Sequence, residues 1–209
     1  MQSAKQYTIP TVEIRRRPVY AFLKRLLDVL LSVIGLATAL LPMVVIALIV
    51  RFDSGRPVIF KQTRLGKGKR PFTVYKFRTM RHTPHTKEEK WADIDDERVT
   101  RVGKLLRKSH LDELPQLWNI LKGEMSFVGP RPETPGLHEE FCAYIDGFDQ
   151  RCLVTPGLTG WAQVNGGYDL PPEEKIRYDV AYIEHRSLLF DFYCMLLTVG
   201  AVLTGKGAR

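Results

Sequence analysis

Residues 29–50 of this chain, VLLSVIGLATALLPMVVIALIV, contain no charged side chain over 22 positions. A helix of roughly 20 apolar residues crosses the hydrocarbon core of a bilayer. The run exceeds the apolar core of a signal peptide, about 7–15 residues, and no small-residue cleavage site follows it before Arg51. A buried helix of a soluble protein is rarely apolar on every face at this length. The run therefore predicts a helix that enters a membrane.

Two further features bear on how this helix enters the membrane. Pro42 lies inside the run, and proline kinks a helix because it removes one backbone hydrogen bond. Basic residues lie on both sides of the run: Arg15, Arg16, Arg17, Lys24 and Arg25 before it, and Arg51, Arg56, Lys61 and Arg64 after it. Because positive flanks favour the cytoplasmic side, we prefer a re-entrant hairpin over residues 21–52, bent at Pro42, to a single span. Asp28 at the entry is expected to pair with Lys24 or Arg25.

The composition limits the class of partner. The chain has 209 residues, a net charge of +8 and 44% hydrophobic residues, which suits a basic lead at 1–20 and one domain at 53–209. Such a charge favours an anionic partner, namely a phosphorylated substrate, an acidic membrane surface or nucleic acid. No groove-reading motif or aromatic stacking platform is present, so we do not expect nucleic acid as a partner.

The remaining sequence predicts a helix-rich α+β domain with little sheet. Short strands are expected at 57–61 and 71–77, and at WAQV, residues 161–164. Residues 82–97 are polar and predict a surface loop. Apolar spacing predicts helices at 99–108, 112–122, 133–149 and 171–186. The apolar stretch 188–204 predicts a helix that lies at the membrane interface or packs on the domain.

Two adjacent carboxylates, Asp112 and Glu113, stand out because residues 98–108 before them hold five basic side chains and no acid. Ser109 followed by Asp112 matches a helix-start signature, and Pro115 is tolerated only in a first turn. The pair is therefore expected at a helix N-terminus, where the helix dipole stabilises negative charge. Ordinary first-turn acids are the alternative interpretation.

Several cations are expected near this acidic pair. Arg131 lies on a turn between two prolines, which suits bidentate contact with phosphate. Lys76 and Arg78 would share one face of a strand. This combination favours metal-assisted phosphoryl transfer, in which a carboxylate attacks phosphorus and Mg²⁺ neutralises phosphate oxygens.

The sequence resembles the small membrane-associated phosphoglycosyl transferases of bacteria, also called bacterial sugar transferases or undecaprenyl-phosphate sugar phosphotransferases. The resemblance runs from about Lys24 to Thr204. It rests on four long segments in order: KRLLDVLLS, PVIFKQTRLGKGKRPFTVYKFRTM, RVTRVGKLLRKSHLDELPQLWNILKGEMSFVGPRPE and TPGLTGWAQVNG. Segments of this length are far more specific than a short motif.

The resemblance implies a two-step reaction. A UDP-sugar delivers its phosphosugar to undecaprenyl phosphate and UMP is released, through a covalent aspartyl intermediate. Asp112 would be the nucleophile and the Mg²⁺ ligand, and Glu113 its acidic partner. The positions implied for substrate binding are Lys76, Arg107, Arg131, Asp179, Trp161 and Gln163. For the last two, a structural role in a turn and strand is the alternative.

The resemblance also implies a cellular setting. The family is monotopic in the bacterial inner membrane, with the catalytic domain facing the cytoplasm, and starts exopolysaccharide, capsule or related glycan synthesis. Its membrane helix breaks at Ser-Pro, whereas this chain has Leu41-Pro42. We expect the minimal catalytic form, without the multi-helix membrane domain of larger relatives, and a homodimer is compatible with it. A non-catalytic basic membrane-associated binding protein is the alternative; it explains the charge and the anchor but not the acidic pair.

Overall fold

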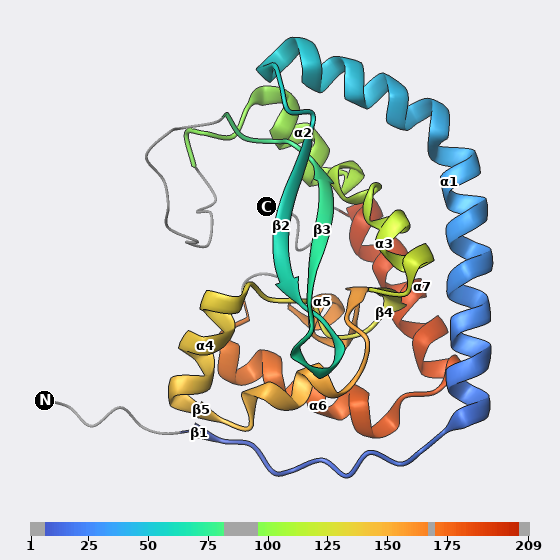
Figure 1. The fold of residues 1–209 in the computed structure, drawn as a ribbon, viewed down its shortest axis with the longest axis vertical. Coiled ribbons are helices and arrows are strands. Elements are labelled where there is room, and N and C mark those ends of the chain that lie inside the picture. Colours follow the sequence, from blue (N-terminus) through green and yellow to red (C-terminus); the bar gives the residue numbers. More distant parts are fainter. Residues whose placement is uncertain (1–6, 82–95, 167–169, 205–209) are drawn as a thin grey trace, which may run out of the picture.

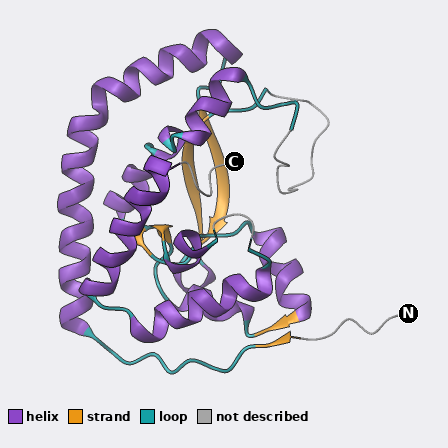
Figure 2. Cartoon of the chain, turned by 180° about the vertical axis from the view of Figure 1, so that it is seen from behind, coloured by secondary structure: helices purple, strands orange, loops and turns teal. Residues whose placement is uncertain are grey.

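The computed structural model describes residues 7–81, 96–166 and 170–204. Over these ranges the chain is mostly helical, with two-stranded sheets between the helices (Figure 2), which confirms the helix-rich α+β prediction. The helices are α1 Pro18–Ser54, α2 Arg101–Lys108, α3 Gln116–Lys122, α4 Pro135–Tyr144, α5 Trp161–Asn165, α6 Pro172–His185 and α7 Leu188–Thr204. The strands are β1 Tyr7–Thr8, β2 Ile59–Leu65, β3 Pro71–Phe77, β4 Ser126–Val128, β5 Ile145–Asp146 and β6 Gly157–Thr159. The 3-10 turns are η1 Lys67–Lys69, η2 Leu111–Glu113 and η3 Phe148–Leu153.

Helix α1 contains the uncharged run and is long and apolar enough to cross a membrane. An 18-residue stretch of this helix has a mean hydropathy of 2.8. Only 11% of that stretch is buried, whereas the core helix of a soluble protein is mostly buried. Figure 1 shows α1 as two arms that meet at an angle, and Pro42 lies within it. Pro42 cannot donate to the Thr38 carbonyl. The residue before the proline is Leu41, which has no hydroxyl. The nearest hydroxyl that the helix uses is that of Thr38, one turn before the proline, which donates to the Ile34 carbonyl at 2.9 Å.

Both flanks of α1 contact the same folded domain. The chain before α1 runs beneath the domain (Figure 1), where β1 pairs in parallel with β5 and Ile9 and Val12 are buried. After the bend, Val50 is buried against Phe77 and Leu106. The segment between Tyr7 and the start of α1, which belongs to the basic lead expected at 1–20, is therefore packed on the domain. We call this segment the strap. It packs there because its few apolar side chains occupy buried positions in the core.

The prediction for Asp28 is wrong. Its carboxylate does not pair along the helix but accepts hydrogen bonds from the Ser126 hydroxyl and the Phe127 amide of β4, both at 3.0 Å. Lys24 instead pairs with Asp191 of α7 at 2.9 Å. A buried carboxylate needs donors, and the packed domain supplies them where the isolated helix would offer only a neighbouring cation. The first arm of α1 is thus hydrogen-bonded directly to β4.

The strand predicted at 71–77 is confirmed as β3, whereas the strand predicted at 57–61 is β2, which begins and ends later, at Ile59–Leu65. The two strands form an antiparallel hairpin in register from Ile59 opposite Phe77 to Leu65 opposite Pro71. Asn119 of α3, fully buried, joins the helix to this hairpin. Its amide donates to the Thr73 carbonyl at 2.7 Å and accepts from the Tyr75 amide at 3.3 Å. These bonds fix α3 against the strand that carries Lys76.

Helix α7 is confirmed as a helix, and its single acid explains how it packs. Asp191 is buried and accepts hydrogen bonds from Tyr182 at 2.7 Å, Lys24 at 2.9 Å and Tyr20 at 3.0 Å. The acid therefore ties α7 to α6 and to the first arm of α1. Its outer face remains apolar and exposed, with Leu189, Phe192, Leu196 and Val199.

Two other sequence predictions fail. The WAQV segment is the helix α5, not a strand, and β6 just before it pairs in parallel with β4. A four-residue apolar run does not distinguish the two conformations by period. The helix expected at 133–149 ends at Tyr144, where β5 and η3 follow. Most of the loop predicted at 82–97 lies outside the described residues.

Candidate active site

The acidic pair lies in a turn between α2 and α3. The backbone reverses at His110, whose φ is +56°, and Asp112 and Glu113 follow in the 3-10 turn η2. Ser109 ends α2, where its hydroxyl donates to the Leu105 carbonyl at 2.9 Å. Pro115 occupies the N-cap of α3. The expected placement in the first turn of an α-helix is therefore wrong, because Ser109 ends the preceding helix instead of starting the next one. The pair lies in the 3-10 turn before α3, so its position is fixed by the backbone of that turn.

Glu113 is the acid that is held by cations. One of its carboxylate oxygens, Oε1, accepts from Lys76 Nζ at 2.6 Å and from an Arg131 guanidinium nitrogen at 2.7 Å. Burial alone would raise the pKa of Glu113, but Arg131 and Lys76 outweigh it and hold that pKa far below its usual range. Glu113 is thus ionised and joins β3 to the turn after β4.

Asp112 has a different environment. Asp112 is 8% exposed as a residue, and its carboxylate makes no hydrogen bond or ion pair with any residue that the structure describes. Burial raises its pKa, Lys76 lowers it in part and the Glu113 charge raises it again. A poorly solvated carboxylate without a hydrogen-bonding partner is suited to react with an electrophile or to bind a metal ion.

Three of the predicted cations gather at the pair. Lys76 and Arg131 contact Glu113, and the Arg107 charge lies close enough to lower the pKa of Asp112. Arg107 is fixed by its Nε, which donates to the Thr79 hydroxyl at 2.9 Å. Gly103 permits this approach of α2, since a Cβ there would lie 2.1 Å from the Thr79 carbonyl oxygen. The site therefore combines the Asp112 carboxylate, which bonds to no described residue, with positive side chains that are held in place.

Arg78 is not brought to the acidic pair. Its guanidinium donates to the Arg56 carbonyl at 2.7 Å, to the Ser54 carbonyl and to the Ser54 hydroxyl at 3.0 Å. It therefore holds the end of α1 against the domain. The alternation that placed it beside Lys76 applies only within a strand, and β3 ends at Phe77.

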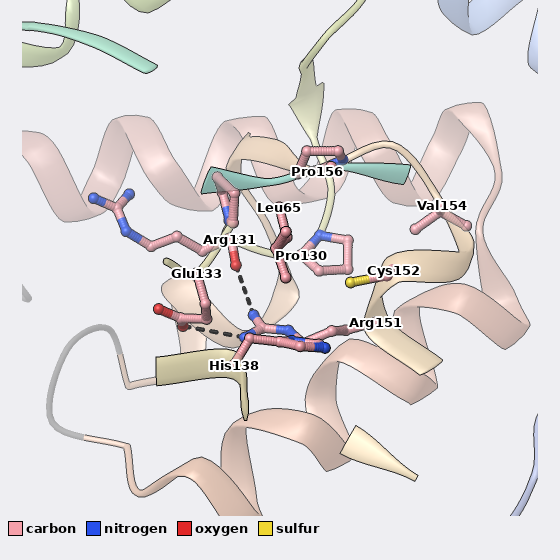
Figure 3. A pocket seen from close by; sticks show the side chains of 11 residues that line it. Leu65, Pro130, Arg131, Glu133, His138, Arg151, Cys152, Val154 and Pro156 are labelled. Carbon is pink, nitrogen blue, oxygen red and sulfur yellow. Dashed lines mark hydrogen bonds and ion pairs between the residues drawn. The ribbon is translucent and has the colours of Figure 1, made fainter. Parts of the chain in front are cut away.

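Asp179 also lies away from the pair. It is 1% exposed on α6 and forms an ion pair with Arg151 at 2.9 Å. Arg151 in turn contacts the turn that carries Arg131 (Figure 3). A small cavity behind this turn is lined by residues that include Pro130, Glu133 and Arg151 but neither acid of the pair. Sequence reasoning missed Arg151 and Glu133, because their spacing in the chain carries no motif that marks them.

Trp161 and Gln163 lie on α5. Trp161 contacts Phe190 and Tyr193 with ring centroids at 5.1 and 6.1 Å, so it packs against α7. The strand of the alternative structural role is not present, because the segment is helical. Both amide atoms of Gln163 are buried and make no hydrogen bond to the part of the chain that the structure describes. Their role in a nucleotide-sugar pocket stays a prediction.

A magnesium ion fits the donors that are present. No group of three or more candidate metal-ligating side chains occurs among the described residues. Mg²⁺ commonly uses only one or two carboxylates and takes its other ligands from substrate phosphates and water. Asp112, whose carboxylate is uncommitted, matches that pattern.

Comparison with known proteins agrees with these features. The family model described as bacterial sugar transferase matches residues 19–205. This match covers most of the chain and includes all but the first residue of α1, the acidic pair and α7. The resemblance inferred from the four sequence segments is therefore confirmed.

Individual relatives are similar over most of this chain. It is 43% identical over 195 residues to UDP-N-acetylgalactosamine-undecaprenyl-phosphate N-acetylgalactosaminephosphotransferase of Aeromonas hydrophila, covering 92% of this chain and 46% of that protein. It is 41% identical over 219 residues to UDP-glucose:undecaprenyl-phosphate glucose-1-phosphate transferase of Xanthomonas campestris pv. campestris, covering 99% and 45%. It is 40% identical over 188 residues to the uncharacterized sugar transferase EpsL of Bacillus subtilis (strain 168), covering 90% of each. The chain thus spans a little under half of the first two relatives.

Proposed function

The chain belongs to the bacterial sugar transferase family, and on this basis we propose that it transfers a sugar phosphate from a UDP-sugar to undecaprenyl phosphate. The products are undecaprenyl-diphosphate sugar and UMP. The observation that carries this proposal is the uncommitted Asp112 carboxylate beside Glu113, which is held by Lys76 and Arg131. The relatives are named for different sugars, glucose and N-acetylgalactosamine, so the donor is proposed only as a UDP-sugar.

The chemistry proceeds in two displacements at one phosphorus. An Asp112 oxygen attacks the phosphorus that bears the sugar, an O–P bond forms, and the P–O bond to UMP breaks with its electron pair leaving on UMP. An oxygen of undecaprenyl phosphate then attacks the same phosphorus, and Asp112 leaves as a carboxylate. Lys76, Arg107 and Arg131 stabilise the charge on the transferring oxygens. Mg²⁺ bound by Asp112 and the diphosphate would neutralise further charge there.

We propose the re-entrant topology for α1. The strap before α1 and the chain after it contact one domain, and this supports placing both ends of the helix on one side of the membrane. The basic flanks favour the cytoplasmic side of the inner membrane. This placement lets the acidic pair meet the phosphate of a polyprenyl lipid at the membrane surface, as the initiating step of exopolysaccharide, capsule or related glycan synthesis requires.

The test uses purified protein in nanodiscs with Mg²⁺, a panel of UDP-sugars, and undecaprenyl phosphate present or absent. Repeated turnover, with many UMP released per protein, should depend on one sugar and on the lipid, and without the lipid release should stop at about one UMP per protein. Asp112→Asn should reduce release to background, whereas the control Asp149→Asn, which breaks an exposed pair with Lys69, should match the wild type. Turnover by Asp112→Asn would remove Asp112 as the nucleophile. No release by folded wild-type protein would favour the non-catalytic binding protein.

A further inference from the structure

Arg151 is a buried arginine that contacts the backbone of the Arg131 turn. It lies on η3 and is 4% exposed. Its guanidinium donates to the Arg131 carbonyl at 2.7 Å and to the Glu133 carboxylate at 3.1 Å, and forms the ion pair with Asp179. Three anchors on one planar group leave it little freedom to rotate.

The far side of the turn is fixed as well. Glu133 accepts from Lys175 Nζ at 2.5 Å, and its backbone carbonyl accepts from the Leu65 amide of β2 at 2.9 Å. Arg64 donates to the Pro132 carbonyl at 2.9 Å. Burial would raise the pKa of Glu133, but Lys175 and Arg151 outweigh it and lower that pKa to about 2, so the anchor is ionised at neutral pH.

The Arg131 residue itself has two distinct ends. Its carbonyl oxygen is bonded to Arg151, while its side chain extends away from Arg151 (Figure 3) and donates to Glu113 at 2.7 Å. Pro130 and Pro132 on either side restrict the backbone. The hydrogen bond from Arg151 to the Arg131 carbonyl therefore restricts the rotation of the peptide between Arg131 and Pro132. This restriction in turn limits the directions in which the Arg131 side chain can point.

We infer that Arg151, held by Asp179 and Glu133, is a positioning residue that orients Arg131 toward the acidic pair. The inference rests on the proposed transfer reaction and adds to it residues that do not touch the substrate. It also reassigns Asp179, which the sequence placed among the substrate-binding residues, to the support of Arg151. In this arrangement Asp179 acts on the reaction through two successive contacts, first with Arg151 and then with the Arg131 peptide.

A double-mutant cycle tests this role. Arg151→Lys keeps the buried charge but not the three anchors, so kcat/KM for UMP release should fall by about tenfold to 100-fold, the size expected when a reacting group is misplaced by about 1 Å. In an Arg131→Lys background the further loss should be less than about twofold, because a flexible ammonium depends little on the tilt of its peptide. Equal losses in both backgrounds, or unchanged turnover in Arg151→Lys, would overturn the inference.

A matched control separates positioning from stability. Arg186 is also buried and donates to the backbone carbonyls of Ile183 and Arg15, but it contacts neither the Arg131 turn nor the acidic pair. Arg186→Lys should lower the Tm as Arg151→Lys does, yet retain wild-type kcat/KM to within about twofold. An equal loss of kcat/KM in Arg186→Lys would contradict a specific role for Arg151. Wild-type protein in the same assay distinguishes the failures, since no release there contradicts the proposed function itself.

Discussion

Replacing Glu113 with glutamine should destabilise the protein through two known contacts. The substitution keeps the shape of the side chain but removes the charge that accepts from Lys76 at 2.6 Å and Arg131 at 2.7 Å. A hydrogen bond to a charged group contributes about 1.5–3 kcal/mol and a neutral one about 1 kcal/mol. Two such exchanges at side chains that are at most 20% exposed predict a loss of about 1–4 kcal/mol. For a chain of this size that is a fall in Tm of roughly 2–16 °C.

The stability that Glu113 contributes depends on pH. The pKa of Glu113 is lowered in the folded protein, so its contribution is fully present above the unfolded-state value of about 4.3 and is lost as the pH falls below it. The Tm difference between the wild type and Glu113→Gln should therefore be full at pH 7 and shrink below about pH 4. Thermal unfolding in nanodiscs measures both values. The exposed pair of Lys69 and Asp149 is the control, and Asp149→Asn should cost at most about 1 kcal/mol. Equal Tm values for the two variants at pH 7 would refute the reasoning.

Three further predictions follow from other contacts. Asp28→Ala leaves the Ser126 hydroxyl and the Phe127 amide without their acceptor and should cost about 2–5 kcal/mol by thermal unfolding, whereas Asp28→Asn, which still accepts, should cost less than half of that. Glu133→Gln should lower the Tm at pH 7 but lose its effect as the pH falls from about 4.3, the pKa of the carboxylate in the unfolded chain, toward about 2, its pKa in the folded protein; a constant difference would contradict this. A cysteine placed before α1, at Thr11, should be labelled only from the cytoplasmic side in membrane vesicles, and periplasmic labelling would replace the re-entrant helix with a span.

The parts of the site that could be predicted from the sequence are those that a local sequence pattern marks. Asp112 and Glu113 are adjacent, Arg131 lies on a proline-bounded turn, and Lys76 lies on a strand of regular alternation. The structure brings these residues together. The polar and charged residue types at these positions are themselves informative, because such side chains are rarely buried without a partner or a function.

The residues that the sequence did not reveal are defined only by tertiary contacts. Arg151 reaches the Arg131 carbonyl from a separate 3-10 turn, and Asp28 reaches β4 across 98 positions to Ser126. Local patterns instead suggested nearer partners, and for Asp28 these were the wrong ones. The strand predicted at WAQV is wrong for a different reason. The segment is too short for the spacing of its apolar residues to distinguish a helix from a strand.

The most direct test of the proposed chemistry is a search for the phosphosugar on the protein. Wild-type protein in nanodiscs is mixed with Mg²⁺ and its UDP-sugar but without undecaprenyl phosphate, and is then quenched with acid. Intact-protein mass spectrometry should detect the added mass of one phosphosugar, located in the peptide that contains Asp112, together with about one UMP released per protein. Asp112→Asn should show neither. UMP release that requires the lipid, with no adduct on the wild-type protein at any time point, would contradict a covalent intermediate on Asp112.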